Sequence, residues 1–287
     1  MSAPEVTIVE VGPRDGLQNE KGPIPAAQKI ELIDLLSAVG FKRIEATSFV
    51  SPKWVPQMAD GSQVMAGITR RPGTRYAALT PNMKGYEAAR DAQVDEVAIF
   101  GAASETFSHK NINCSIADSI ERFRPVAEAA KADGIPVRGY ISCVVACPYD
   151  GPIAPVEVAR VADLLFGLGC YEVSLGDTIG QGTPETVGTM LDAVLAVAPP
   201  ERLAGHYHDT NGRALESVAI SMERRLRVFD SAVGGLGGCP YAPGAKGNLS
   251  TGTLARDLAA KGMSTGLDLS ALTHAEKFVG DLRGLLE

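Results

Sequence analysis

Cysteine is scarce in this chain, and the way it is spaced excludes a disulfide-based fold. The 287 residues include only Cys114, Cys143, Cys147, Cys170 and Cys239. An odd, scattered set of this kind is a poor disulfide framework and suits a reducing cytosol. Cys143 and Cys147 lie four residues apart, but no second cysteine pair or adjacent histidine completes a zinc site. We interpret them as buried strand cysteines.

Long apolar runs and an excess of positive charge are also missing. The longest apolar candidate, Met190–Ala198, is far shorter than the roughly 20 residues of a membrane helix. No basic-then-apolar signal peptide opens the chain, and the strand-like run Val6–Val11 leaves no room for a transit peptide. With 27 Lys and Arg against 34 Asp and Glu, the net charge is −7. We therefore expect no nucleic-acid and no membrane partner, whereas an anionic small molecule needs only a local basic group.

Strand-like and helix-like segments alternate from end to end. Helical spacing of apolar residues marks five intervening segments: Ala26–Val39, Ser115–Asp133, Pro155–Gly167, Pro184–Val197 and Arg213–Glu223. Glycine closes several helices, at Gly40, Gly134 and Gly169, as expected just beyond a helix end. Apolar, β-branched runs occur at Val6–Val11, Arg43–Thr47, Tyr76–Leu79, Val94–Phe100, Val137–Val145, Glu172–Leu175, Leu203–His208 and Val228–Val233.

This order predicts an α/β fold with a parallel sheet, closed into a (β/α)8 TIM barrel. The rival is an open doubly wound sheet, which would favour a glycine-rich phosphate turn after the first strand. Gly12–Gly16 supplies no such turn. We expect a single catalytic domain over 1–287, with the barrel over about 5–262 and a C-terminal helical extension over about 263–287. In such barrels the chemistry lies at the carboxyl ends of the strands.

Two histidines stand at the end of the seventh predicted strand. His206 and His208 point the same way because side chains alternate along a strand, and Tyr207 points the other way. Two imidazoles on one face can bind one metal ion. The alternative is that one histidine is a hydrogen-bonded core residue and the other is incidental.

One carboxylate follows the first predicted strand, and another lies within the second. Asp15 lies at the same rim as the histidines, because strands one and seven are neighbours across strand eight; the alternative is a turn aspartate before Gly16. Glu45 faces the barrel interior or mouth, where a cation is its natural partner. Asn248 ends a glycine-rich loop after strand eight. Oxygen and nitrogen ligands without thiolate suit Mg²⁺ or Mn²⁺, with Zn²⁺ or Co²⁺ as substitutes.

Five sequence blocks carry a resemblance to a known family. They are VGPRDGLQNEK (11–21), SFVSPKWVPQM (48–58), KNINCS (110–115), SLGDTIG (174–180) and GLGGCPY (235–241). With the two histidines, they make the chain similar to the DRE-TIM metallolyases, and among these to the 3-hydroxy-3-methylglutaryl-CoA (HMG-CoA) lyases. The resemblance runs from about residue 5 to about residue 270.

The resemblance implies roles for individual residues. The implied metal ligands are Asp15, His206, His208 and Asn248, with Glu45 holding a water on the metal. Arg14 matches the catalytic arginine at the thioester carbonyl, and Cys239 matches the loop cysteine. The positions that match the substrate pocket are Gln18, Ser48, Phe49, Asn111, Tyr140, Ser174, Asp177 and Thr178.

The resemblance also implies a reaction. This is the metal-dependent retro-Claisen cleavage of (S)-3-hydroxy-3-methylglutaryl-CoA to acetyl-CoA and acetoacetate, as in leucine degradation and ketone body metabolism. His206 or Asp15 would remove the hydroxyl proton, Arg14 would stabilise the enolate and Cys239 would protonate it. The absence of the cysteine-bearing tail of animal relatives fits a bacterial cytoplasmic enzyme, and a homodimer is the expected assembly.

Other functions fit the same pattern less completely. The first is a lyase for a related substrate, a longer-chain 3-hydroxyglutaryl-CoA or citramalyl-CoA, or a synthase running the condensation. A non-enzymatic binding barrel would be expected to lack the metal-ligand residues, which are all present here. A pyruvate-type aldolase shares the metal barrel but should lack the Cys239 loop.

Overall fold

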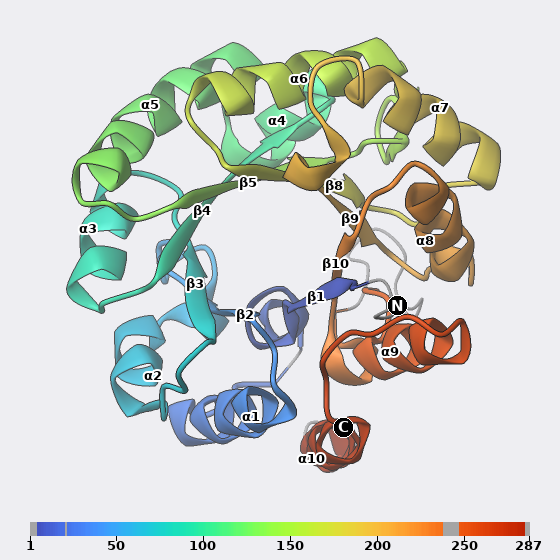
Figure 1. The fold of residues 1–287 in the computed structure, drawn as a ribbon. Helices are drawn as coiled ribbons and strands as arrows, with labels where there is room; N and C mark the ends of the chain where they lie inside the picture. Colours follow the sequence, from blue (N-terminus) through green and yellow to red (C-terminus); the bar gives the residue numbers. More distant parts are fainter. Residues whose placement is uncertain (1–4, 21, 238–246, 285–287) are drawn as a thin grey trace.

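In the computed structural model, eight parallel strands close into a barrel (Figure 1). The structure describes residues 5–20, 22–237 and 247–284. The eight predicted strands are all present, so the TIM barrel is confirmed and the open doubly wound sheet is excluded. Around the barrel the order is β1 (Thr7–Glu10), β10 (Val228–Ser231), β9 (Leu203–Tyr207), β8 (Glu172–Asp177), β5 (Val137–Ser142), β4 (Glu96–Ala102), β3 (Arg75–Leu79) and β2 (Arg43–Ser48), which pairs again with β1.

Helices surround the barrel on its outer side (Figure 1). The predicted α1 and α6 match at both ends, and the predicted α7 runs three residues too far. Left-handed backbone at Gly40, Gly134 and Gly169 (φ +99°, +70° and +98°) confirms the glycines expected at helix ends. The helices are α1 (Ala26–Val39), α2 (Gly61–Gly67), α3 (Met83–Asp91), α4 (Glu105–Ile112), α5 (Ile116–Ala132), α6 (Pro155–Gly167), α7 (Pro184–Val194), α8 (Ala214–Glu223), α9 (Thr251–Ala260) and α10 (Leu269–Gly284), with the short turns η1 (Gly12–Gly16), η2 (Pro56–Met58), η3 (Pro200–Arg202) and η4 (Val233–Gly235).

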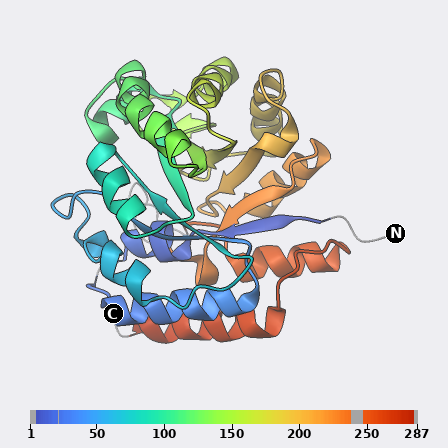
Figure 2. The same ribbon diagram turned by 60° about the vertical axis from the view of Figure 1, so that its left-hand side comes forward.

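The helix predicted beyond residue 263 is α10, which packs along α1 on the outside of the barrel (Figure 2). Its buried residues, Leu272, Ala275, Val279 and Leu282, recur every three or four positions and so form one apolar stripe. None of the described helices is both long and apolar enough to span a membrane.

A short hairpin after β5 was not predicted. It pairs β6 (Ala146–Cys147) with β7 (Gly151–Pro152) in antiparallel fashion. Cys143 and Cys147 are both buried, as expected, and Cys147 lies in a strand. Cys143 does not, because it follows the end of β5 and has a positive φ of 62°. Neither cysteine belongs to a group of potential metal ligands within the described part of the chain.

Ion pairs cross the interior of the barrel. Arg43 on β2 pairs with Glu172 on β8, directly across the barrel, and Glu172 also pairs with Arg138 on β5. Arg138 then reaches Asp230 on β10. All four residues are buried. The interior below the mouth is therefore a charged network, and the main apolar core lies between the strands and the helices.

Candidate metal centre at the barrel mouth

The turn η1 carries Arg14 and Asp15 directly after β1. Glycine is required on both sides of this pair, because the backbone is closely approached there. A Cβ on Gly12 would lie 2.6 Å from Glu10 Oε1, and a Cβ on Gly16 would lie 2.5 Å from Leu236 Cβ. The turn is thereby fixed against η4 at the carboxyl end of the barrel.

The histidines lie at the carboxyl end of β9. Their ring centroids are 5.5 Å apart, whereas Tyr207 points outward and its hydroxyl lies 2.7 Å from Ser221 Oγ on α8. The predicted alternation is therefore confirmed. His206 is the fourth residue of β9, and His208, beyond its end, forms an isolated bridge with Asn248.

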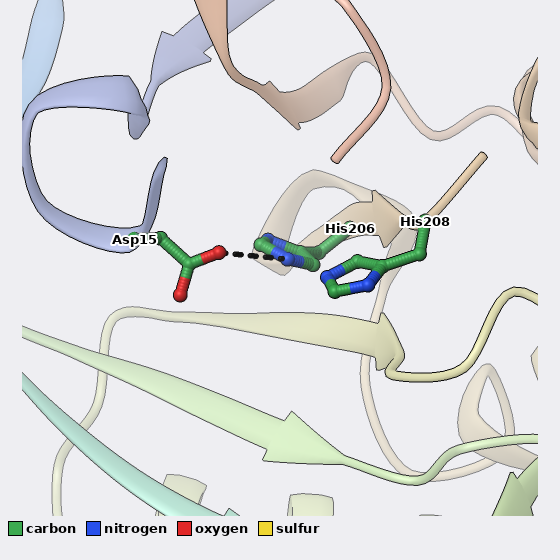
Figure 3. Close-up of side chains that lie close together, drawn as sticks. All are labelled: Asp15, His206 and His208. Atoms are coloured by element: carbon green, nitrogen blue, oxygen red, sulfur yellow. Dashed lines mark ion pairs between the residues drawn. The ribbon is translucent and has the colours of Figure 1, made fainter. Parts of the chain in front are cut away.

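Asp15, His206 and His208 form one cluster, with a ligand atom from each lying within 4.8 Å of the others. The Asp15 carboxylate faces the two imidazoles, with Oδ2 3.9 Å from His206 Nε2 (Figure 3). Asn248 joins them, because its Nδ2 donates to Asp15 Oδ2 at 2.8 Å and to the Leu236 carbonyl at 3.2 Å. The structure thus brings all four predicted ligands together.

The protonation states suit metal binding. Burial raises the pKa of Asp15, but Arg14, both histidines and the Asn248 hydrogen bond outweigh burial and hold it at about 2. Burial, with the neighbouring His206, lowers the pKa of His208 to about 4. At neutral pH the cluster therefore offers an ionised carboxylate and a neutral imidazole, the forms that coordinate metals.

One further observation tests whether a cation fits here. His208 Nδ1 is buried and has no hydrogen-bond partner among the described residues. A buried imidazole nitrogen without a hydrogen-bond partner is costly unless another group binds it. The residues therefore fit a divalent cation, and their oxygen and nitrogen atoms are the donors that Mg²⁺ and Mn²⁺ accept.

Arg14 lies between two carboxylates at the edge of this cluster. Its Nε donates to Glu45 Oε2 and its Nη1 to Asp15 Oδ1, both at 2.6 Å, and its guanidinium stands over the Tyr140 ring. Burial raises the pKa of Glu45 despite the charge of Arg14. Glu45 Oε1 is buried without a hydrogen bond to any described residue. Glu45 and Asp15 thus hold the guanidinium of Arg14 in place.

A cavity of about 730 Å³ opens above the cluster. Its cationic lining comes from Arg14, Lys110 and Arg122, and its apolar lining includes Phe100 and Phe107. Asp15 is the only carboxylate among the described residues that line it. The predicted site residues that line the cavity are Arg14, Asp15, Gln18, Asn111, Tyr140, Thr178, His206 and His208.

The other predicted site residues that the structure describes do not line the cavity. Asp177 accepts hydrogen bonds from the Gln181 and Gly182 amides, and so holds the loop after β8. Phe49 packs against the apolar core, and Ser48 Oγ is buried without a partner in the described ranges. Ser174 Oγ donates to Asp230 in the barrel interior. Cys239 lies outside the described residues.

Asp230 is a polar neighbour of the site that sequence analysis missed. It sits opposite His206 in the register of β10 and β9, and its Oδ2 lies 3.2 Å from His206 Nδ1. Burial lowers the pKa of His206, but Asp230 and Asp15 raise it to a net value above normal. The available sequence signal was a carboxylate, Asp230, in the middle of the predicted strand Val228–Val233.

Comparison with known proteins gives one consistent match. The family model described as HMGL-like covers residues 5–279. A 3-hydroxy-3-isohexenylglutaryl-CoA/hydroxy-methylglutaryl-CoA lyase of Pseudomonas aeruginosa is 58% identical over 271 residues, covering 94% of this chain and 90% of that protein. A crystal structure of the HMG-CoA lyase from Brucella melitensis is 62% identical with a TM-score of 0.97, covering 98% of this chain and all of that one.

A further solved structure holds a ligand. It is an HMG-CoA lyase from Acinetobacter baumannii in complex with coenzyme A and 3-methylmalate. It is 38% identical to this chain with a TM-score of 0.93, and covers 98% of this chain and 92% of that one.

Proposed function

The chain belongs to the HMGL-like family, and from this premise we propose that it is a carbon–carbon lyase that cleaves (S)-3-hydroxy-3-methylglutaryl-CoA to acetyl-CoA and acetoacetate. The observation that carries the proposal is the cluster of Asp15, His206 and His208 at the floor of a cavity that Arg14 also lines. The coenzyme A complex of the relative from A. baumannii supports an acyl-CoA substrate.

A divalent cation, Mg²⁺ or Mn²⁺, is the cofactor we propose, held by Asp15, His206, His208 and Asn248. When bound, it supplies Lewis acidity that makes the C3 hydroxyl of the substrate more acidic. The chain's part is to keep the donors ready. Asp15 is ionised at neutral pH because its pKa is about 2, and His208 is neutral because its pKa is about 4.

Arg14 stabilises the charge that develops on the thioester oxygen. Cleavage of the C2–C3 bond leaves acetoacetate and the enolate of acetyl-CoA, so negative charge moves to that oxygen. The side-chain hydrogen bonds of Arg14 to described residues use Nε and Nη1, so Nη2 remains for the substrate. Because its partners hold the guanidinium before the substrate arrives, little reorganisation is needed during the reaction.

The hydroxyl proton needs an acceptor, and Glu45 is better suited than the two predicted bases. Asp15 is a weak base, because its pKa is about 2. His206 is committed to the cluster through Nε2 and to Asp230 through Nδ1. Glu45 combines a pKa raised by burial with an unpartnered buried oxygen, and one water molecule can relay the proton to it.

The released enolate carbon takes up a proton, and Cys239 remains the predicted donor. The prediction rests on the family resemblance. A Cys239→Ala variant with wild-type turnover would remove that role and leave the roles of Arg14 and the metal ligands untouched.

A second candidate substrate class has support of its own. The relative from P. aeruginosa, at 58% identity, carries 3-hydroxy-3-isohexenylglutaryl-CoA in its name. The cavity of about 730 Å³ has apolar lining from Leu79, Val50, Val55, Phe100 and Phe107. We propose that a longer apolar substituent at C3 is also accepted.

The test is release of acetoacetate from HMG-CoA, and of the matching 3-oxo acid from longer-chain analogues. The purified protein is assayed as prepared, after chelation, and after Mg²⁺ or Mn²⁺ is added back. We expect release that chelation abolishes and either ion restores. Cleavage that persists without any divalent cation, or no cleavage of any of these thioesters, would contradict the proposal.

Three further expectations complete the proposed function. They are a single catalytic domain over 1–287, a homodimer, and activity in a bacterial cytoplasm, in a route such as leucine degradation. The bacterial relative from P. aeruginosa supports the third. Light scattering on the purified protein tests whether it forms a homodimer.

A further inference from the structure

The two imidazoles of the cluster differ in how they are held. His206 Nδ1 lies 3.2 Å from Asp230 Oδ2, and on its other side Nε2 faces Asp15 at 3.9 Å. His208 Nδ1 has no partner among the described residues. Only His206, within the part of the chain that the structure describes, is thus linked to a carboxylate behind its ring.

Asp230 is surrounded by donors. Arg138 donates from Nη2 to Oδ1 at 2.7 Å and from Nη1 to Oδ2 at 3.1 Å. Ser174 Oγ donates to Oδ2 at 2.7 Å. Such a buried site favours the ionised carboxylate, which can only accept hydrogen bonds. The hydrogen shared with His206 must therefore be carried by Nδ1.

We propose that Asp230 is a positioning residue of the metal centre, which holds His206 as the tautomer protonated on Nδ1 and directs a bare Nε2 at the cation. Arg138 and Ser174 keep the Asp230 carboxylate ionised and correctly turned. A carboxylate behind a metal-binding imidazole fixes ring orientation and raises ligand basicity. The inference rests on the cation site of the proposed function and adds the residues that order it.

Glu172 provides a matched control. It is a buried carboxylate of the same interior network, and it pairs with Arg138 as Asp230 does. Its other arginine partner is Arg43, and it makes no described contact with His206. Removing its charge disturbs the network without touching the imidazole, so a merely structural role of Asp230 predicts the same outcome for both residues.

The first measurement is the dissociation constant for Zn²⁺ and for Mn²⁺, by titration calorimetry on wild-type protein, Asp230→Asn and Glu172→Gln. We expect Asp230→Asn to weaken binding by about 10–100-fold, the usual effect of losing such a partner, and Glu172→Gln to leave it unchanged. Equal affinity in Asp230→Asn and wild type, or equal weakening in both variants, would overturn the inference.

The second measurement needs no variant of Asp230. In the Zn²⁺-loaded wild-type protein, ¹⁵N-edited spectra of the four histidines report which ring nitrogen carries hydrogen, and His206→Gln identifies the His206 signals. We expect a slowly exchanging proton on Nδ1 of His206. A proton on Nε2 would contradict the inference even if Asp230→Asn failed to fold.

These readouts separate two failures. A wild-type protein that binds neither ion contradicts the proposed function and this inference together. A wild-type protein that binds the ions and cleaves HMG-CoA, while Asp230→Asn binds them equally well, contradicts the inference alone.

Discussion

Arg14 is the side chain whose removal should affect the chemistry most selectively. Replacing it with Gln removes a charged donor at the oxygen where negative charge develops, a change that typically costs about 2.7–4 kcal/mol, or roughly 10²–10³-fold in kcat. We expect that loss in acetoacetate release at saturating Mg²⁺. The control is Arg90→Gln, because Arg90 forms an exposed ion pair with Asp91 on the surface. A wild-type kcat for Arg14→Gln would refute its assigned role.

At the scale of residues, positions that depend on side-chain alternation and on strand ends were predictable from the sequence. His206 and His208 share a face because side chains alternate along a strand, and Asp15 follows a strand two places away in the barrel. Asp230 was missed because its partners Arg138 and Ser174 lie on β5 and β8, and only closure of the barrel brings them together. Glu45 was expected to have a cation as its partner, and within the chain that cation is the guanidinium of Arg14.

Glu10, a buried carboxylate at the end of β1, connects several elements at the barrel mouth. Its Oε1 accepts from the amides of Gly12 and Val233, and its Oε2 accepts from the hydroxyl of Thr251. Glu10 therefore ties η1, η4 and α9 together behind the metal ligands. Burial is the main reason that its pKa rises from 4.5 to about 7, against the effect of these hydrogen bonds.

The raised pKa of Glu10 predicts how the stability of the protein changes with pH. A carboxyl with a higher pKa when folded favours folding below its unfolded pKa and loses that contribution as pH rises to the folded value. Between 4.5 and about 7 the loss corresponds to about 3 kcal/mol, at roughly 1.4 kcal/mol per pKa unit. Urea unfolding is measured at pH 4.5 and pH 7.5 for wild type and Glu10→Gln. As the pH rises, the free energy of unfolding of wild type should fall relative to that of Glu10→Gln. Parallel pH profiles for the two proteins would contradict the assignment.

At the scale of elements, apolar, β-branched runs predicted every barrel strand, and helical spacing predicted α1, α5, α6, α7 and α8. Helix α10 was expected only as a helical extension after the barrel, and α9 was not predicted. The hairpin β6–β7 has two residues in each strand, too few for any pattern to appear. The short helix α4 carries polar residues on most of its length and begins with a cap from Ser104, whose side chain accepts from Phe107 N. Tertiary contacts rather than periodicity form such elements.

The molecule as a whole depends on α10 covering the outside of α1 (Figure 2). Leu272, which is fully buried near the start of α10, should cost about 2–5 kcal/mol of unfolding free energy when replaced by Ala. The Asp268 amide at this end of α10 donates to the Val39 carbonyl at the end of α1, just before β2 begins. This is the opposite end of the barrel from the metal centre, so we expect kcat to stay unchanged. The exposed Thr273→Ala is the control. Urea unfolding at constant pH measures the stability of Leu272→Ala and of the control. Equal unfolding midpoints for Leu272→Ala and wild type would contradict the packing of α10 on α1.

The proposed chemistry depends on a cation bound at the barrel mouth. Diffraction from crystals grown with Mn²⁺, recorded at the manganese absorption edge, locates the ion independently of any assumed mechanism. We predict one anomalous peak at the barrel mouth, coordinated by Asp15, His206 and His208, that disappears on chelation. No peak there, or an ion bound elsewhere while acetoacetate release continues, would contradict it.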